Sequence, residues 1–229
     1  MNISVKHIGF GTLALCVIAA AALTISWPYL SARSAYGELR AKYVNSLGID
    51  FEALKAENPD TVGWIQIDDT VIDYPVVKGE ADEYLDLAFD KTESKAGTLF
   101  LDPMNKADLT DKVNFIYGHS LLDGSMFSCI PDYADQGYFE RHRSITLVLP
   151  DRELSLTPWA ALRQPGDDGT LHVGVFDDEE AWTLYKNHVA NHALARGERD
   201  ASSIDRLVCL VTCSYNSLNE RTLLFCSVD

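Results

Sequence analysis

Basic residues are scarce in this chain of 229 residues. Lys and Arg together number 19 against 34 Asp and Glu, which gives a formal net charge of −15 at pH 7. Such a charge makes nucleic acid and anionic lipid surfaces poor partners, because their phosphates repel an acidic protein. A cationic amine would be tolerated or attracted, but solubility is the simpler reason for the acidic composition. We therefore expect no nucleic-acid function.

Cysteine is also infrequent, and its five positions do not predict a disulfide framework. Cys209 and Cys213 lie four residues apart on one predicted strand, a separation of about 13 Å at about 3.3 Å per residue. That separation is too long for a disulfide. Cys129 and Cys226 lie in apolar segments and are most simply small buried residues. We expect no structural disulfide, which leaves a catalytic thiol free.

The sequence has no clear metal-binding pattern. His188 and His192 have the i, i+4 spacing of a zinc pair on a helix, yet no glutamate lies between them and no third ligand is evident. His142 and His172 have no motif around them, and no segment has the spacing of a calcium-binding loop. We therefore interpret the paired histidines as surface residues, and we expect no metal and no cofactor.

One long apolar run extends from Ile8 to Leu30. It is long enough to cross the hydrocarbon core of a bilayer, which takes about 20 residues. Lys6 before it favours a cytoplasmic N-terminus, and Trp27 and Tyr29 suit the outer membrane interface. A cleaved signal peptide is the alternative, since Ala19 to Ala22 could offer small residues to a peptidase. Because the run continues past these residues, we favour an uncleaved single-pass anchor in the cell membrane, with the rest of the chain extracellular.

The residues after this run, about 200 in number, are enough for one domain with its own core. Ser34 can cap a helix that continues to about Leu47. Asp50 can cap a second helix, Phe51 to Glu57, which Asn58-Pro59 would end. The expected division is a cytoplasmic tip and transmembrane anchor over 1–30, a helical linker over 31–57 and a β-barrel domain over 58–229.

Many short β-rich segments with little helical alternation predict a mainly β fold, a closed or nearly closed barrel with flanking helices. One strong helix interrupts the pattern from about Asp178 to Ala195, with apolar residues at intervals of three and four and an acidic first turn. The predicted strands cover residues 62–67, 71–77, 98–101, 113–117, 144–149, 152–162, 206–213 and 222–228, with another short strand possible at 170–175.

Three chemically active residues lie at the ends of predicted strands. Cys213 ends the apolar run 206–213, and Arg221 opens the next strand after a polar loop. Neighbouring antiparallel strands would bring these two residues to the same rim of a sheet. His119 follows the strand 113–117, but its distance from Cys213 does not follow from the sequence. A thiol, an imidazole and a guanidinium are the minimum set for acyl transfer through a thioester.

With these residues identified, the chain resembles the class B sortases, which are membrane-anchored cysteine transpeptidases of Gram-positive bacteria. The family's Leu-x-Thr-Cys strand end is similar to Leu210-Val211-Thr212-Cys213, its Tyr-Gly-His to Tyr117-Gly118-His119, and its downstream arginine to Arg221. Weaker matches occur in the family's order, so the resemblance covers roughly residues 50–229. They are Val62-Gly-Trp-Ile65, Ile72-Asp-Tyr-Pro-Val76, Gly97-Thr-Leu-Phe-Leu-Asp102, Gly124-Ser-Met-Phe127 and Tyr138-Phe139.

The resemblance implies a sortase-like closed eight-stranded barrel with N-terminal helices and a helix between the sixth and seventh strands. It also implies a mechanism in which Cys213 attacks the carbonyl of Thr in a sorting signal, of an Asn-Pro-x-Thr type. Arg221 would stabilise the oxyanion, and His119 would protonate the leaving amine. The implied partners are surface proteins that carry the signal, and an amine of the peptidoglycan precursor or a pilin lysine.

The resemblance further implies a substrate groove that Leu85, Val211 and Thr212 contact, with the helix 178–195 as one wall. Two positions differ from the family. Val211 stands where the family commonly has serine, and Ser214 follows the cysteine where an acidic residue is usual. Both differences bear on the choice of substrate more than on the chemistry.

Three alternatives stay open. An L,D-transpeptidase also has histidine before cysteine, but its Ser-x-Gly-Cys-x-Arg string is absent and Arg221 is too far along the chain. A papain-like or NlpC/P60 peptidase has cysteine before histidine, the reverse of the order here. A non-catalytic surface adhesin could share the anchor and the β content, yet it would not need the three polar groups.

Overall fold

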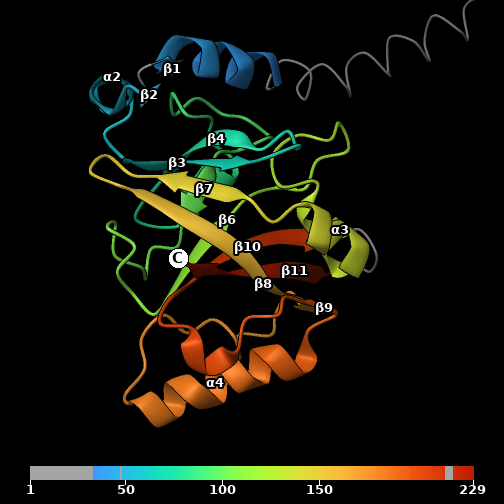
Figure 1. Ribbon diagram of the computed structural model, residues 1–229. Helices are drawn as coiled ribbons and strands as arrows, with labels where there is room; N and C mark the ends of the chain where they lie inside the picture. The colour runs from blue at the N-terminus through green and yellow to red at the C-terminus, as the bar shows by residue number, and fades with distance from the viewer. Residues whose placement is uncertain (1–32, 47, 215–218) are drawn as a thin grey trace, which may run out of the picture.

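The computed structural model describes residues 33–46, 48–214 and 219–229, with the backbone alone for Cys213 and Ser214. The predicted membrane anchor, residues 8–30, lies outside the described residues. Within the ranges that are described, no helix is both long enough and apolar enough to cross a bilayer. The described chain forms a β-barrel with helices packed around it (Figure 1).

Eight strands close into one mixed β-barrel, which confirms the predicted fold class. Neighbours are hydrogen-bonded in the order β11-β10-β6-β5-β4-β3-β7-β8, and β8 pairs with β11 to close the ring. The pairs β4–β5 and β6–β10 are parallel, and the others are antiparallel. The strands are β3 (Thr61–Ile67), β4 (Asp73–Val77), β5 (Leu99–Leu101), β6 (Val113–Tyr117), β7 (Ile145–Val148), β8 (Glu153–Pro165), β10 (Leu207–Ser214) and β11 (Glu220–Val228).

Strands β6, β10 and β11 are buried on both faces, which explains their nearly continuous apolar sequences. In β10, Val208 and Leu210 belong to the core inside the barrel. Their neighbours Leu207, Cys209 and Val211 belong to a second core on the outer side. The alternation follows from the two-residue period of a strand. The barrel therefore needs a cover over these three strands.

Helix α4 (Glu179–His192) provides that cover on the outside of the barrel (Figure 1), and it lies between β8 and β10 in chain order. Asp178 caps it, since its carboxylate accepts a hydrogen bond of 2.8 Å from the Ala181 N–H. The buried face presents Trp182 and Tyr185 to the second core. This position confirms the predicted helix between the sixth and seventh barrel strands.

The prediction that this helix continues to Ala195 is wrong by about one turn. The Leu194 N–H donates to the Ala161 carbonyl over 2.8 Å. The next two residues form β9 (Ala195–Arg196), a short strand that pairs with β8 outside the ring. Pairing with the part of β8 that lies beyond β7 thus replaces the last helical turn.

The N-terminal helices are partly as predicted. Helix α2 (Phe51–Glu57) begins after Asp50, whose carboxylate accepts from the Ala53 N–H over 2.9 Å. The preceding helix covers residues 33–43 and ends earlier than expected. A tight hairpin of β1 (Val44–Asn45) and β2 (Gly48–Ile49) replaces its last turn. Gly48 in β2 has a φ of 118°, a conformation that glycine adopts without strain.

Some elements are not as expected from the sequence. The segment 170–175 contains turns rather than a strand. The elements that sequence reasoning missed, apart from β1, β2 and β9, are α3 (Gln136–Arg141) and the short 3₁₀ helices η1 (Glu83–Leu85), η2 (Ile130–Ala134) and η3 (Ala201–Ser203).

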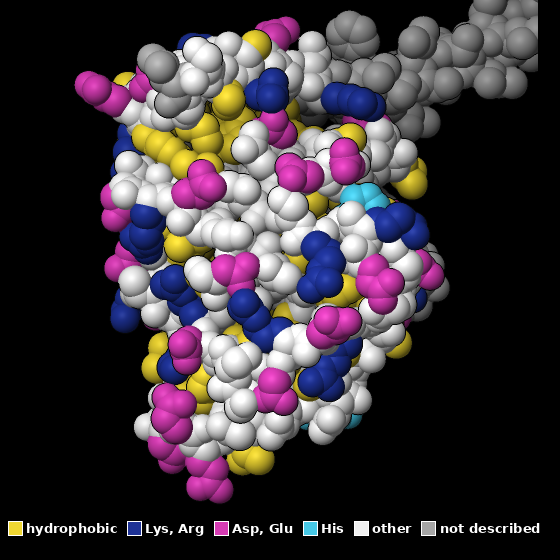
Figure 2. Space-filling view, in the orientation of Figure 1, with side chains coloured by type: hydrophobic (Ala, Val, Ile, Leu, Met, Phe, Trp, Pro, Cys, Tyr) yellow, Lys and Arg dark blue, Asp and Glu magenta, His cyan; other side chains and the backbone are white. Residues whose placement is uncertain are grey.

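Acidic side chains are spread over the visible face of the molecule, with basic side chains between them (Figure 2). They do not form one continuous acidic patch on this face. This distribution agrees with solubility as the simpler reason for the net charge.

We predict that Trp182→Ala destabilises the protein by about 3–5 kcal/mol, because a fully buried indole would leave a cavity in the second core. Chemical denaturation would measure the loss. The matched control is Leu184→Ala on the same helix, whose residue is 64% exposed. The control should change the free energy of unfolding by less than about 0.5 kcal/mol. Equal losses for the two variants would mean that α4 is not the cover of this core.

Candidate active site

The strand register brings the three predicted active residues to one end of the barrel. In the parallel pair β6–β10, Tyr117 lies opposite Val211. His119 and Cys213 each follow two residues later, so both lie beyond the same end of neighbouring strands. In the antiparallel pair β10–β11, Cys213 lies directly opposite Arg221. The strand register therefore places His119 at the same end of the barrel as Cys213, which the sequence alone could not establish.

A cavity of about 450 Å³ opens at this end. It contains five of the six residues singled out from the sequence, namely Leu85, His119, Val211, Thr212 and Arg221. The sixth, Cys213, has only its backbone described. The remaining lining residues are Asp82, Phe100, Asp102, Pro103, Tyr117, Gly118 and His172.

His119 is held by a backbone group. Its Nε2 lies 2.8 Å from the Leu85 carbonyl oxygen at the end of η1. A carbonyl can only accept, so Nε2 carries a proton and Nδ1 is the nitrogen left for chemistry. Leu85 was expected to contact substrate. The structure shows that its backbone also fixes the tautomer of the half-buried histidine.

Two glycines of the recognised strings allow this close approach. A Cβ at Gly97 would lie 2.5 Å from the Leu85 carbonyl oxygen, and one at Gly118 would lie 2.3 Å from a methyl group of Leu99. Both distances are shorter than atoms tolerate. Gly97 also has a φ of 61°, which favours glycine. Gly97 therefore leaves room for the carbonyl that holds His119, and Gly118 leaves room for Leu99 and Phe127 beside it.

Arg221 and the two residues before Cys213 form another side of the cavity. Val211 and Thr212 are buried, whereas Arg221 is exposed at the start of β11. Among the described residues, no carboxylate lies within ion-pair distance of the guanidinium, so its charge is not neutralised by a fixed partner. A planar, permanently charged donor in this state suits a developing oxyanion.

A second cavity, of about 220 Å³, adjoins the first. The two cavities share Tyr117, His172, Val211 and Arg221. The second is otherwise lined by the segment that follows β8 and by apolar strand residues. These residues are Phe115, Gln164, Gly166, Asp167, Asp168, Gly169 and Leu223.

His172 is the site residue that sequence reasoning missed. Its Nε2 lies 2.6 Å from Oδ2 of Asp102, 70 residues away in the chain. Burial and the nearby Asp102 carboxylate raise the pKa of Tyr117, so its hydroxyl stays protonated. No local spacing relates these three residues. The one sequence signal for this pair was that Asp102 ends the segment Gly97-Thr-Leu-Phe-Leu-Asp102, which resembles the family.

Neither cavity is lined by a residue of α4, contrary to the expectation that this helix forms a wall of the groove. The wall comes instead from the connection that precedes α4, which carries His172. Helix α4 holds that connection, because the Tyr185 hydroxyl donates to the Leu171 carbonyl over 2.8 Å. The effect of α4 on the site is therefore indirect.

The other described cysteines are poor nucleophiles. Cys209 and Cys226 are fully buried, and burial raises the pKa of both thiols. Burial raises the pKa of Cys129 to about 11. A thiol in this state has little thiolate at neutral pH and reacts slowly. All three are free thiols in the structure.

The other histidines do not form a site. His188 and His192 are exposed and stack on each other with ring centroids 4.2 Å apart. His142 stacks on the Tyr138 ring at 3.9 Å. Within the part of the chain that is described, no three or more His, Cys, Asp or Glu side chains are grouped to hold a metal ion.

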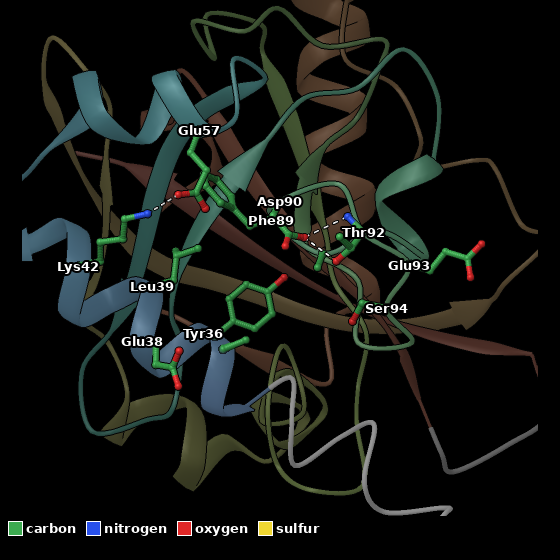
Figure 3. Close-up of a pocket in the computed structure, with 12 residues that line it drawn as sticks. Tyr36, Glu38, Leu39, Lys42, Glu57, Phe89, Asp90, Thr92, Glu93 and Ser94 are labelled. Atoms are coloured by element: carbon green, nitrogen blue, oxygen red, sulfur yellow. Dashed lines mark hydrogen bonds and ion pairs between the residues drawn. The ribbon is translucent and has the colours of Figure 1, made fainter.

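A cavity of about 410 Å³ lies between helix 33–43 and residues 88–94 (Figure 3). Two of its polar contacts are internal: Lys42 donates to Glu57 over 2.5 Å, and the Thr92 hydroxyl donates to Asp90 over 2.6 Å. It contains neither a thiol nor an imidazole. This cavity therefore lacks the groups for acyl transfer that the cavity containing His119 has.

No protein-family model matches the chain, but two curated relatives are similar to it. Sortase B of Staphylococcus aureus is 24% identical over 193 residues, which cover 83% of this chain and 79% of the relative. Sortase B of Listeria monocytogenes is 30% identical over 161 residues, which cover 70% of this chain and 65% of the relative.

Solved structures with the same fold carry the same family name. The structure of Clostridium perfringens sortase B has a TM-score of 0.74 and 25% identity, and the match covers 79% of this chain and all (100%) of that one. A Staphylococcus aureus sortase B–substrate complex has a TM-score of 0.73 and 23% identity, with 86% and 92% covered. A sortase B complexed with triglycine gives 0.73 and 23%, with 88% and 95% covered.

We predict that Gly97→Ala disturbs the His119 tautomer, because the new methyl group would displace the Leu85 carbonyl that holds Nε2. Imidazole ¹⁵N chemical shifts would report the change. Gly124→Ala is the matched control, since Gly124 also has a positive φ of 81° but a Cβ there meets no atom within 4 Å. Both variants carry backbone strain, and only Gly97→Ala should alter the histidine. Identical His119 spectra in the two variants would contradict this role of Gly97.

Proposed function

Because the chain belongs to the class B sortases, we propose that it is a cysteine transpeptidase that processes surface proteins. It cleaves a sorting signal after Thr, holds the acyl group as a thioester on Cys213 and transfers it to an amine. The observation that carries this proposal is the shared cavity of His119 and Arg221 at the strand end that also bears Cys213.

The first half of the reaction needs a thiolate and an acid. Cys213 attacks the Thr carbonyl carbon as thiolate, and the carbonyl oxygen becomes an oxyanion to which Arg221 donates hydrogen bonds. The carbon–nitrogen bond then breaks, and the leaving amine takes the proton from Nδ1 of the His119 imidazolium. Nε2 stays bound to the Leu85 carbonyl throughout, so the ring keeps its orientation. The products are a thioester and a neutral imidazole.

The second half reverses these roles. A neutral amine attacks the thioester, the carbon–sulfur bond breaks and the thiolate is restored. His119 accepts the proton that the nitrogen loses as the amide forms. The solved complex of a sortase B with triglycine supports an amine of this kind. The acceptor is a peptidoglycan precursor amine or a pilin lysine.

The sorting peptide occupies the cavity of about 450 Å³. Leu85, Val211 and Thr212 contact it there. Phe100 and Pro103 add apolar surface to the same cavity. The valine at position 211 offers no hydroxyl to the peptide, so a substrate group that needs a donor at this point is disfavoured. The predicted anchor, residues 8–30, tethers the enzyme to the cell membrane with the catalytic domain outside.

We predict that Cys213→Ala abolishes both cleavage and ligation of an Asn-Pro-x-Thr peptide with triglycine as acceptor, because no other described thiol reaches the cavity. Mass spectrometry of the products would measure both reactions. Cys129→Ala is the control and should keep turnover, apart from any loss of stability. Turnover by Cys213→Ala would exclude the thioester mechanism. A folded wild type that forms no covalent adduct with any sorting peptide would favour the adhesin alternative.

We predict that Arg221→Lys lowers turnover by about 10²-fold or more, because one ammonium cannot reproduce the fork that holds an oxyanion. Steady-state kinetics with the same peptide would measure the loss. Arg163→Lys is the matched control: Arg163 is exposed on the neighbouring strand β8 and lines neither cavity of the site. Near-normal turnover by Arg221→Lys would assign Arg221 a peripheral role.

A further inference from the structure

The site contains a second imidazole, and that imidazole is paired with a carboxylate. His172 lies on the segment between β8 and α4, and Asp102 directly follows β5. Their side chains meet at 2.6 Å between Nε2 and Oδ2. A mechanism in which His119 alone transfers protons leaves His172 and Asp102 without a role in the reaction.

The pair has a fixed orientation. Asp102 is buried, and its other oxygen accepts from the Met104 N–H over 2.9 Å. The His172 ring packs edge to face against Phe115, with centroids 5.2 Å apart, and against Tyr117 at 6.5 Å. Because a carboxylate only accepts, Nε2 of His172 carries a proton, and Nδ1 is the nitrogen that can exchange one. Nδ1 has no hydrogen-bond partner among the residues that the structure describes.

His172 also lies where the two cavities of the site meet. Arg221 and Tyr117 share this position with it, and His119 lies in the larger cavity. The smaller cavity has two further carboxylates, Asp167 and Asp168. Hydrogen bonds from Thr170 hold the pKa of Asp168 below its usual value, so this carboxylate stays ionised. Asp82 is the remaining titratable group of the larger cavity. Although Arg221 also lines it, the smaller cavity therefore offers two carboxylates to a cation.

The acceptor amine is such a cation. An α-amino group has a pKa of about 8 and a lysine amine about 10.4, so both arrive largely as ammonium at pH 7. An ammonium has no lone pair and cannot attack the thioester. It must lose one proton before attack and a second as the amide forms. His119, neutral after acylation, can accept only one of them.

We propose that His172, held by Asp102, is the general base that removes the first proton from the acceptor ammonium; this rests on the proposed transpeptidase function. The nitrogen–hydrogen bond breaks, and the proton moves to Nδ1 of His172. The neutral amine then attacks, the carbon–sulfur bond breaks, and His119 takes the second proton. Cys213 returns to thiolate and His119 to imidazolium. His172, whose side chain is 45% exposed, releases its proton to solvent.

The test is His172→Gln in the full-length protein, with three acceptors of different basicity: hydroxylamine, triglycine and Nα-acetyl-lysine. At pH 7 we expect about a tenfold lower kcat for triglycine, because an amine of pKa about 8 is about one-tenth neutral there. The loss should be larger for the lysine amine and small for hydroxylamine, which is already neutral. For triglycine, the ligation rate of the variant should rise with pH up to about 8.

Two further variants sharpen this test. Asp102→Asn should reproduce the pattern, because an amide that donates to Nε2 would put the proton on Nδ1. His188→Gln is the matched control, an exposed histidine on α4 outside both cavities. It should change no acceptor's rate. The burst of peptide cleavage measures acylation separately, and His172→Gln should affect it far less than ligation. Thermal melting checks that each variant is folded.

Several outcomes would overturn the proposal. An equal loss for all three acceptors, or a loss confined to KM, would make His172 a binding or structural residue. An unchanged ligation rate in His172→Gln would mean that water, and not His172, removes the first proton. If wild-type protein forms no thioacyl adduct at all, the transpeptidase function fails and the role of His172 fails with it. If the adduct forms and only the acceptor dependence is absent, the proposed function stands without this base.

Discussion

The parallel pairing of β6 with β10 is the constraint on which the rest of the site depends. It aligns Tyr117 with Val211, so the residues just beyond these two strands emerge at one end of the barrel. The antiparallel partner β11 then returns Arg221 to the same level as Cys213. A shift of one residue in either pairing would turn the alternating apolar residues of β10 to the wrong cores, at a cost far above that of any surface contact. The geometry of the chemistry is thus protected by the packing of the two cores.

The inner and outer cores also contribute differently to stability and to specificity. The inner core fixes the strands, whereas the outer core requires α4 as a cover. Through the bond between Tyr185 and Leu171, the same helix holds the segment that carries His172. Changes in the connection before α4 would alter the lining of the smaller cavity while β6, β10 and β11 keep their register. The strand end that bears Cys213 and the segment that bears His172 are therefore separate parts of the fold.

Much of this fold was predictable because its signals are local. The Asp50 cap, the strand segments and the helix after Asp178 all follow from short-range patterns, and the structure confirms them. The placement of His119 was not predictable from spacing, because it depends on a parallel pairing between distant strands. The hold of Leu85 on His119 is a backbone contact that no side-chain pattern encodes. The partnership of His172 with Asp102 spans 70 residues and has no motif. Long-range contacts and backbone contacts account for what the sequence left open.

The helix at 33–43 has a consequence for how this protein can be shortened. The Tyr36 hydroxyl donates to the Gly97 carbonyl and also lies 2.9 Å from the Thr98 hydroxyl. Gly97 packs against the carbonyl that orients His119. The first helix is therefore part of the scaffold behind the histidine and not a spacer that can be removed. A recombinant fragment that begins after Tyr36 would keep every barrel strand and still lose the contact that supports Gly97 behind His119. Through Tyr36 and Gly97, a pull on the N-terminal end of the chain would reach the carbonyl that holds the His119 ring.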